Sequence, residues 1–275
     1  MSEIVWRGMT RAQLDAAYNN TEAVKDSGAR RDAWTARSAE FRAAHPDLLD
    51  LAYGPRPRNR IDIFRCGKSQ SPLFVFIHGG YWQRNSKEIF ACMAEGPLAH
   101  SLDVALIGYT LAPDASLTEI VGEVRVALRW LRREGPRFGV GAGKIVVSGW
   151  SAGGHLTAMT LAEADAGLAI SGIFDIEPCR LNYLNDALRL TLEEQAALSP
   201  IWQLPRQSAP LAIAFGTAEL PELQRQSRDY YSARKAAGLP SELMPLEGHN
   251  HFSILDELSD PKGRIAVSAA RLARD

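Results

Sequence analysis

A serine flanked by glycines is the strongest chemical signal in the sequence. The segment 149–153, GWSAG, follows an apolar run at residues 144–148 and precedes a second apolar segment at 155–161. A strand that turns sharply into a helix at such a motif strains the serine backbone and exposes its hydroxyl. The glycines on either side permit close backbone packing. We therefore predict that Ser151 is a nucleophile. The alternative is a glycine-rich turn whose serine caps a helix.

A second glycine motif, HGGYW at residues 78–82, directly follows the apolar run Leu73–Ile77. Acyl transfer needs N–H donors for the oxyanion of its tetrahedral intermediate, and glycines at the end of a strand can supply them. The N–H of the residue after the nucleophile usually completes the set. The predicted oxyanion-hole residues are Gly79, Gly80, Tyr81 and Ala152. A plain glycine turn is the alternative, and His78 is expected to steady this loop rather than to act as a base.

A serine must be activated by a base, usually a histidine that a carboxylate orients. On a strand-to-helix turn of this kind the acid and then the histidine follow the serine along the chain. Only His249 and His251 lie far enough downstream. We favour His251, because the apolar residues after it would anchor it where a loop meets a helix. The two histidines could instead bind a metal, but no third ligand stands at a useful spacing, so neither a metal nor a cofactor is predicted.

The acid is expected on the loop after the apolar run at residues 211–215. Glu219 is favoured by its position and Glu222 is its rival. Glu219 precedes Pro221, and proline favours the first turn of a helix, so Glu219 could merely interact with a helix dipole.

The elements that must hold these residues alternate in a regular way. Short continuous apolar runs are typical of strands buried on both faces of a parallel sheet. They lie at residues 73–77, 104–107, 144–148, 168–170 and 211–215, and 61–64 reads as a half-exposed strand. Between two of these runs an apolar stripe at residues 117–131 has helical spacing. The pattern predicts an α/β fold with a doubly wound, mostly parallel sheet.

Composition predicts one ordinary globular domain over residues 1–275. The sequence is 46% hydrophobic and has a formal net charge of −1, which gives no reason to expect a nucleic acid or membrane partner. A helical preamble occupies residues 1–50, with a break at Asn19 and Asn20, and a cap insertion over the active site is expected at 177–209. Three scattered cysteines, no signal peptide and no apolar run near the ~20 residues of a membrane span favour the cytoplasm.

Taken together, these residues resemble the kynurenine formamidase (arylformamidase) family of the α/β-hydrolase superfamily. HGGYW is the most specific element of the resemblance, which covers most of the chain. Its other parts are residues 9–20, 53–55, 149–155, 184–190, 198–200, 221–227 and 251–252. The resemblance implies the α/β-hydrolase fold, with helices on both faces of the sheet.

The resemblance also implies an activity. Family members hydrolyse N-formylkynurenine to kynurenine and formate, a step of tryptophan catabolism, with a metal-independent Ser-Asp-His triad. Ser151 and His251 match that triad, whereas Glu219 stands where the family has aspartate, which is a departure. We expect hydrolysis of a small formamide, amide or ester through an acyl-enzyme on Ser151. The alternatives are a short-acyl carboxylesterase, a hydrolase of another N-formyl or enamide intermediate in ring degradation, and a non-catalytic binding protein.

Aromatic side chains near the motifs could bind a planar small-molecule substrate by stacking. The candidates are Tyr81, Trp82 and Trp150, with core packing as the alternative for the two tryptophans. Arg180 or Arg189 in the insertion is a candidate partner for a substrate carboxylate. The oligomeric state stays open, with a homodimer as one alternative because exposed helix faces in such folds often pair.

Overall fold

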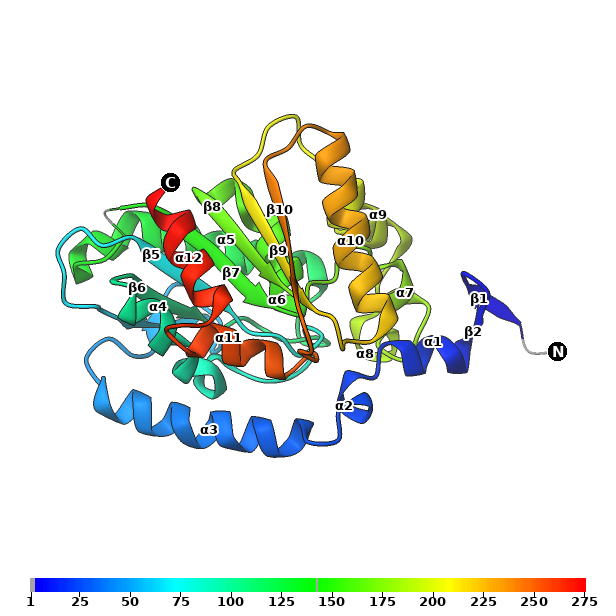
Figure 1. Cartoon of the computed structure of the whole chain (residues 1–275), viewed down its shortest axis with the longest axis horizontal. Coiled ribbons are helices and arrows are strands. Elements are labelled where there is room, and N and C mark those ends of the chain that lie inside the picture. The colour runs from blue at the N-terminus through cyan, green and yellow to red at the C-terminus, as the bar shows by residue number, and fades with distance from the viewer. Residues whose placement is uncertain (1–2, 142) are drawn as a thin grey trace.

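The protein is described by a computed structural model over residues 3–141 and 143–275, built around one twisted sheet (Figure 1). Eight strands follow the order β10-β9-β8-β7-β5-β6-β4-β3. The strands β5 to β10 run parallel, and β3 and β4 pair antiparallel at one edge. Their bounds are β3 Leu51–Ala52, β4 Arg60–Phe64, β5 Leu73–Ile77, β6 Asp103–Ile107, β7 Ile145–Trp150, β8 Ala166–Ile170, β9 Leu211–Gly216 and β10 Ser241–Leu246.

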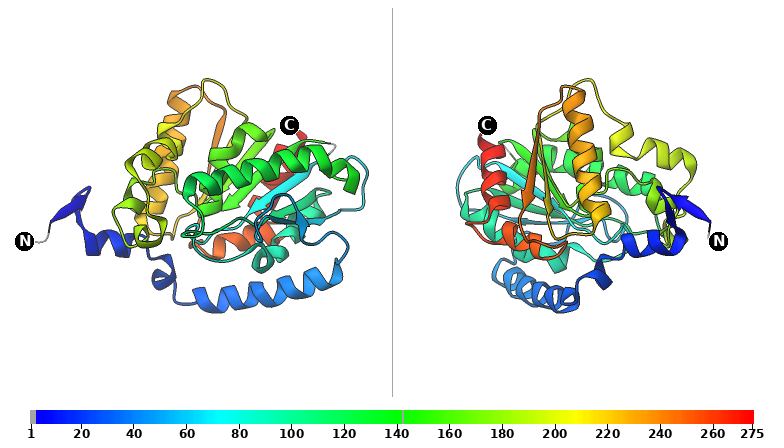
Figure 2. Two further views of the ribbon diagram at one scale, coloured as in Figure 1. Left: turned by 180° about the vertical axis from the view of Figure 1, so that it is seen from behind. Right: turned by 45° about the vertical axis from the view of Figure 1, so that its right-hand side comes forward.

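Helices cover both faces of this sheet (Figure 2). Alternate residues of each central strand point to opposite faces, so each face has its own apolar cluster. One cluster joins the sheet to α5 (Leu117–Glu134), α6 (Ala152–Thr160) and α10 (Pro221–Ala236). The other joins it to η1 (Lys87–Ala94), α11 (Asp256–Ser259) and α12 (Arg264–Arg274). The predicted α/β architecture is therefore confirmed.

The N-terminal segment forms a small hairpin and three helices. Its elements are β1 Ile4–Trp6, β2 Met9–Thr10, α1 Arg11–Ala17, α2 Asn20–Ala23 and α3 Ser27–Ala44. The expected break lies between α1 and α2, where the Asn19 side chain accepts a hydrogen bond from the Glu22 N–H and caps α2. Beyond it, α3 runs along the lower side of the molecule in Figure 1 and packs on η1. This segment therefore reaches the same side of the domain as η1.

The interval at residues 177–209 consists of short helices. They are α7 Glu177–Arg180, α8 Asn185–Leu188, α9 Leu192–Ala197 and η4 Pro200–Trp202. The Tyr183 N–H donates to Asp15 Oδ1 at 2.9 Å, which joins this interval to α1. The remaining elements are α4 Glu95–Ala99, η2 Gly135–Phe138, η3 Leu161–Glu163 and η5 Ser253–Leu255. No helix in the described parts of the chain has the length and apolar character to cross a bilayer.

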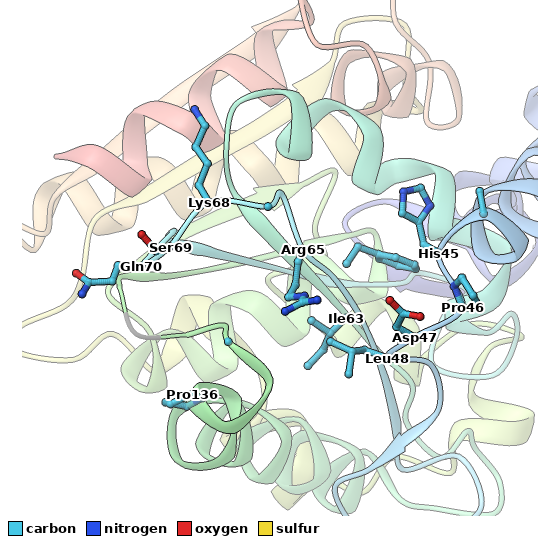
Figure 3. A pocket seen from close by; sticks show the side chains of 14 residues that line it. His45, Pro46, Asp47, Leu48, Ile63, Arg65, Lys68, Ser69, Gln70 and Pro136 are labelled. Atoms are coloured by element: carbon cyan, nitrogen blue, oxygen red, sulfur yellow. The ribbon is translucent and has the colours of Figure 1, made fainter.

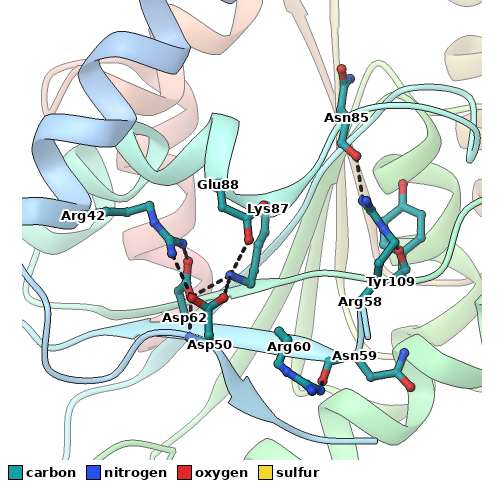
Figure 4. A network of polar contacts seen from close by, with 10 residues as sticks. All are labelled: Arg42, Asp50, Arg58, Asn59, Arg60, Asp62, Asn85, Lys87, Glu88 and Tyr109. Carbon is teal, nitrogen blue, oxygen red and sulfur yellow. Dashed lines mark hydrogen bonds and ion pairs between the residues drawn. The ribbon is translucent and has the colours of Figure 1, made fainter. Parts of the chain in front are cut away.

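A buried ionic cluster ties α3 to the sheet (Figure 4). Asp62 on β4 is fully buried, and its carboxylate is bound by Lys87 Nζ at 2.8 Å, by Arg42 of α3 and by the Asp50 N–H. The expectation of a half-exposed strand at residues 61–64 was wrong, because the polar position of that strand is buried with its counter-ions rather than facing water. The cluster links three elements that share no local sequence.

Asp62→Asn should lower the free energy of unfolding by about 3 kcal/mol, because Lys87 and Arg42 would lose a buried charge that they share. Urea denaturation at pH 7 measures the change. Glu242→Gln is the matched control: its ion pair with Arg271 is half exposed, and it should cost less than about 1 kcal/mol. Equal losses in the two variants would contradict the role given to the cluster.

Candidate active site

Ser151 lies in the sharp turn between β7 and α6. Its φ of 58° and ψ of −117° place it in a strained region for a residue with a side chain. A Cβ on Gly153 would overlap the Ile77 carbonyl, and one on Gly149 would overlap the Gly153 carbonyl. The two glycines thus let α6 begin against β5. The Ser151 hydroxyl makes no capping hydrogen bond, which argues against the helix-cap alternative.

The Ser151 hydroxyl faces a histidine and a carboxylate. His251 Nε2 lies 3.1 Å from Ser151 Oγ, and His251 Nδ1 lies 3.3 Å from Glu219 Oε2. All three residues are at most 5% exposed. A hydroxyl, an imidazole and a carboxylate in this order are the groups that a serine hydrolase uses as nucleophile, base and orienting acid. The three side chains come from separate loops at the carboxyl edge of the parallel strands.

The other oxygen of the Glu219 carboxylate is held from two sides. Ser171 Oγ donates to Glu219 Oε1 at 2.5 Å, and the Gly216 N–H donates to it at 2.7 Å. These bonds fix the carboxylate so that Oε2 faces the histidine. Its rival Glu222 points elsewhere, because it forms an ion pair with Arg225 at 2.8 Å and accepts a hydrogen bond from the Tyr18 hydroxyl at 3.2 Å.

The two downstream histidines have different surroundings. His249 Nε2 lies 3.3 Å from Glu257 and its Nδ1 lies 3.1 Å from the Ser253 carbonyl, so its ring faces away from Ser151. His251 is held from behind, because Trp150 Nε1 donates to the His251 carbonyl at 2.8 Å and the two rings lie 4.9 Å apart. The pair does not converge on one point, so the geometry gives no support to a shared metal.

The loop after β5 has the backbone of an oxyanion hole. Gly80, Tyr81 and Trp82 all have positive φ, at 122°, 52° and 59°. A Cβ on Gly79 would lie 2.7 Å from the Trp150 carbonyl, so only glycine fits beside the nucleophile turn. The N–H groups of Gly80 and Tyr81 donate to no acceptor within residues 3–141 and 143–275. They are thus free to bind a substrate oxygen, and their role as an oxyanion hole stays a prediction.

The carbonyls of the same loop are held on its far side. The Tyr109 hydroxyl donates to the His78 carbonyl at 2.9 Å, and Asn85 Nδ2 donates to the Gly79 carbonyl at 3.1 Å. Arg58 in turn donates to the backbone carbonyls of Asn85 and Tyr109 at 2.6 and 2.8 Å (Figure 4). With the carbonyls fixed away from Ser151, the peptide groups cannot rotate freely. This frame preorganises the N–H groups for an oxyanion.

The three predicted aromatic contacts differ in position. Tyr81 and Trp150 line a small pocket beside Ser151, with a volume of about 40 Å³. Tyr81 is also fixed at its hydroxyl, which donates to the Tyr18 carbonyl at 2.6 Å and accepts from Asn20 at 2.9 Å. Trp82 is fully buried against His155, with ring centroids 4.9 Å apart, and the structure does not bring it to the pocket.

One wall of this pocket comes from the N-terminal segment, which contributes Asn20, Thr21 and Arg31. The oxyanion loop contributes Gly80, Arg84 and Asn85 to the same pocket. Within the described parts of the chain, residues 177–209 contribute no lining residue, although they were expected to cap the site. They support the wall indirectly, because Gln83 of the oxyanion loop donates to the Leu184 carbonyl at 2.9 Å.

A larger surface hollow lies away from this site. It measures about 650 Å³ and lies beside His45, Arg65 and Lys68 (Figure 3). Those residues follow α3 and β4 and precede β5, so the hollow lies at the amino edge of the parallel strands. The Ser151 hydroxyl stands at the opposite, carboxyl edge, where sites in such sheets form. The smaller pocket is lined by Ser151 and His251, the predicted nucleophile and base, so it is the candidate active site.

Comparison with known proteins agrees with this geometry. The BD-FAE family model matches residues 61–171. Kynurenine formamidase of Danio rerio is 27% identical over 93% of this chain and 94% of its own length, and that of Salmo salar is 29% identical over 78% and 77%. Esterase LipC of Mycobacterium tuberculosis is 26% identical over 75% of this chain and 60% of its own.

A crystal structure described as a thioesterase from Silicibacter sp. tm1040 superposes with a TM-score of 0.85 at 27% identity, covering 93% of this chain and 98% of the other. The chain is a hydrolase of the α/β-hydrolase superfamily. Its resemblance to kynurenine formamidases is confirmed over most of its length.

Several residues of the hydrolase's site were not predicted from its sequence. Ser171 follows the buried strand β8 and stands at the same sheet edge as Ser151, so its place after an apolar run was a usable signal. Asn85 and Arg58 donate to backbone carbonyls. Every residue type has such a carbonyl, so these contacts produce no recognisable sequence motif. Arg31 and Arg84 reach the pocket from distant segments, and only the folded chain brings them together.

Glu219→Gln should reduce the kcat of the hydrolase by about 10³-fold or more, because an amide cannot stabilise the imidazolium formed at His251. Glu222→Gln is the matched control, and it should change kcat by less than about threefold, since Glu222 faces Arg225. Initial rates with p-nitrophenyl acetate measure both effects. The reverse order of the two losses would make Glu222 the acid.

Two buried histidines should make the hydrolase unstable in mild acid. Burial lowers the pKa of His78 and of His155 to about 4, below the usual ~6.5. Between these pH values the unfolded chain binds protons that the folded chain does not. The stability that the neutral histidines contribute is therefore fully present above about pH 6.5 and is lost as the pH falls toward 4.

For His155 the expected loss of unfolding free energy between pH 7 and pH 5 is about 2 kcal/mol. Urea denaturation of His155→Gln at both pH values should show a drop smaller than that of the wild type by about this amount. The exposed His45 supplies the control, because His45→Gln should keep the wild-type drop. If His155→Gln loses as much unfolding free energy between pH 7 and pH 5 as the wild type does, the effect of His155 is excluded.

Proposed function

We propose that this hydrolase cleaves N-formylkynurenine, or a closely similar aryl formamide, to the free amine and formate. The observation that carries the proposal is the contact of Ser151 Oγ with His251 Nε2 at 3.1 Å, with Glu219 behind the imidazole. The full-length similarity to kynurenine formamidases supports the choice of substrate. The 3.3 Å distance between Glu219 Oε2 and His251 Nδ1 supports glutamate as the acid.

The first half of the reaction forms an ester. His251 Nε2 takes the hydroxyl proton as Ser151 Oγ attacks the formyl carbon, and the carbonyl oxygen becomes an oxyanion. The N–H groups of Gly80, Tyr81 and Ala152 would hold that charge. The imidazolium, stabilised by Glu219, then gives its proton to the leaving nitrogen. The C–N bond breaks, and the amine departs from a formyl ester on Ser151.

The second half removes the formyl group. A water molecule gives a proton to His251 and attacks the ester carbon, and the oxyanion is held again by the same N–H groups. His251 then returns the proton to Ser151 Oγ, and formate leaves.

A short-acyl carboxylesterase is the second candidate. The same three residues would cleave an activated ester, and the similarity to esterase LipC favours this alternative. It differs from the first in the leaving group, since an alkoxide needs less protonation than an amine. A cytoplasmic location and a homodimer stay predictions.

Wild-type protein should hydrolyse both N-formylkynurenine and p-nitrophenyl acetate, and Ser151→Ala should lose more than 10³-fold on each because the nucleophile is absent. Absorbance of the released kynurenine and nitrophenol gives the two rates. Ser232→Ala, on the exposed face of α10, is the control and should keep full activity.

Turnover of the ester alone would remove the formamide proposal and leave the esterase. A fluorophosphonate probe separates both from a binding protein, because it should label wild-type Ser151 and leave the alanine variant unlabelled. Failure to label the folded wild type would contradict the proposed chemistry.

A further inference from the structure

Two arginines line the same small pocket as the catalytic serine and histidine. Arg31 comes from α3, and Arg84 comes from the loop after β5. They come from segments more than fifty residues apart in sequence. A pocket with two guanidinium groups beside its nucleophile presents a positive potential to the part of a substrate that is not cleaved.

Arg31 differs from the other arginines of α3 in its ion pairs. Arg30 binds Asp26 and Asp256, Arg37 binds Glu95, and Arg42 binds Asp62. In the parts of the chain that the structure describes, neither Arg31 nor Arg84 forms an ion pair with a carboxylate. The helix thus satisfies its other guanidinium groups within the protein, whereas the pocket arginine lacks a protein counter-ion.

A second observation concerns the Arg31 side chain itself. Its Nε atom is buried and has no hydrogen-bond acceptor. A buried donor without a partner costs free energy that a partner of opposite charge would recover. Nothing in the protein fills this position, so an acceptor brought by a ligand would satisfy it. A carboxylate suits the planar guanidinium best, because it can accept two parallel hydrogen bonds.

We infer that Arg31 and Arg84 bind a carboxylate of the substrate and so select anionic substrates at the Ser151 site. The inference rests on the proposed function, because it names the substrate class of that same site. Arg180 and Arg189, the candidates from the sequence, do not line this pocket, and Arg180 is bound to the Gln195 side chain. The N-terminal segment therefore supplies substrate selection, while the sheet edge supplies the chemistry.

The test compares charged and neutral forms of one substrate. N-formylkynurenine and its carboxamide share the scissile bond and differ only in the carboxylate. Arg31→Gln and Arg84→Gln should each raise the KM for N-formylkynurenine at least tenfold, leave its kcat within about twofold, and leave kcat/KM for the carboxamide within about twofold. Activity on the carboxamide also shows that each variant is folded.

Arg37→Gln is the matched control, because Arg37 lies on the same helix but binds Glu95 outside the pocket. It should leave both substrates unchanged. Equal losses on the charged and neutral substrates, or no loss on either, would overturn the inference, since the arginines would then not recognise the carboxylate.

A second substrate pair keeps this test independent of the formamide proposal. If wild-type protein does not cleave N-formylkynurenine, that proposal fails, and the arginines are tested with 4-acetoxybenzoate and 4-acetoxybenzamide. The wild type should then prefer the carboxylate ester at least tenfold, and both arginine variants should lose the preference. An equal rate on the two esters in the wild type would overturn the inference on its own.

Discussion

The close approach of α6 to the end of β5 is the constraint on which the catalytic arrangement depends. At Gly153 there is no room for a side chain against the Ile77 carbonyl, and at Gly79 there is none against the Trp150 carbonyl. These contacts press the nucleophile turn and the oxyanion loop together. The strained backbone of Ser151 is tolerated because the packing on both sides determines it. The hydroxyl and the N–H donors thereby share one small space.

The histidine and its acid reach that space through the parallel sheet. Strands β7, β8 and β9 end at one edge, so the residues after them meet although twenty or more positions separate them. Ser151, Ser171 and Glu219 each follow one of these strands. Ser171 binds Glu219, and His251 joins Glu219 to Ser151. The topology thus supplies proximity, and local hydrogen bonds supply orientation.

The sequence predicts the central strands well because these strands are buried on both faces and read as continuous apolar runs. It does not predict β10 (Ser241–Leu246), an edge strand that contains Pro245 and has two exposed positions. Its burial pattern lacks the apolar run by which the other strands are recognised. Asp62 leads to a wrong prediction of exposure. A charged residue within a strand is expected to face water, and only the fold shows that its counter-ions from α3 and η1 allow it to be buried.

The candidate site divides along the same line. Ser151 and the HGGYW loop are predicted from local motifs, because their function depends on backbone shape that glycines encode. The choice between Glu219 and Glu222 depends on where α10 begins. The short segment between the two glutamates does not by itself show where that helix starts. Trp82 was predicted to contact substrate because it is close in sequence to the glycine motif. Its neighbour Tyr81 faces the pocket, but the ring of Trp82 lies in the core.

The helix α3 carries two attachments of different kinds, and this has an evolutionary consequence. Arg42 anchors the helix to the interior through Asp62, whereas Arg31, three turns earlier, stands at the pocket. Mutation can therefore alter the residue at the pocket without disturbing the anchor or the glycines around Ser151. Descendants of such a scaffold can acquire new specificities through a peripheral helix while the reaction itself is inherited intact.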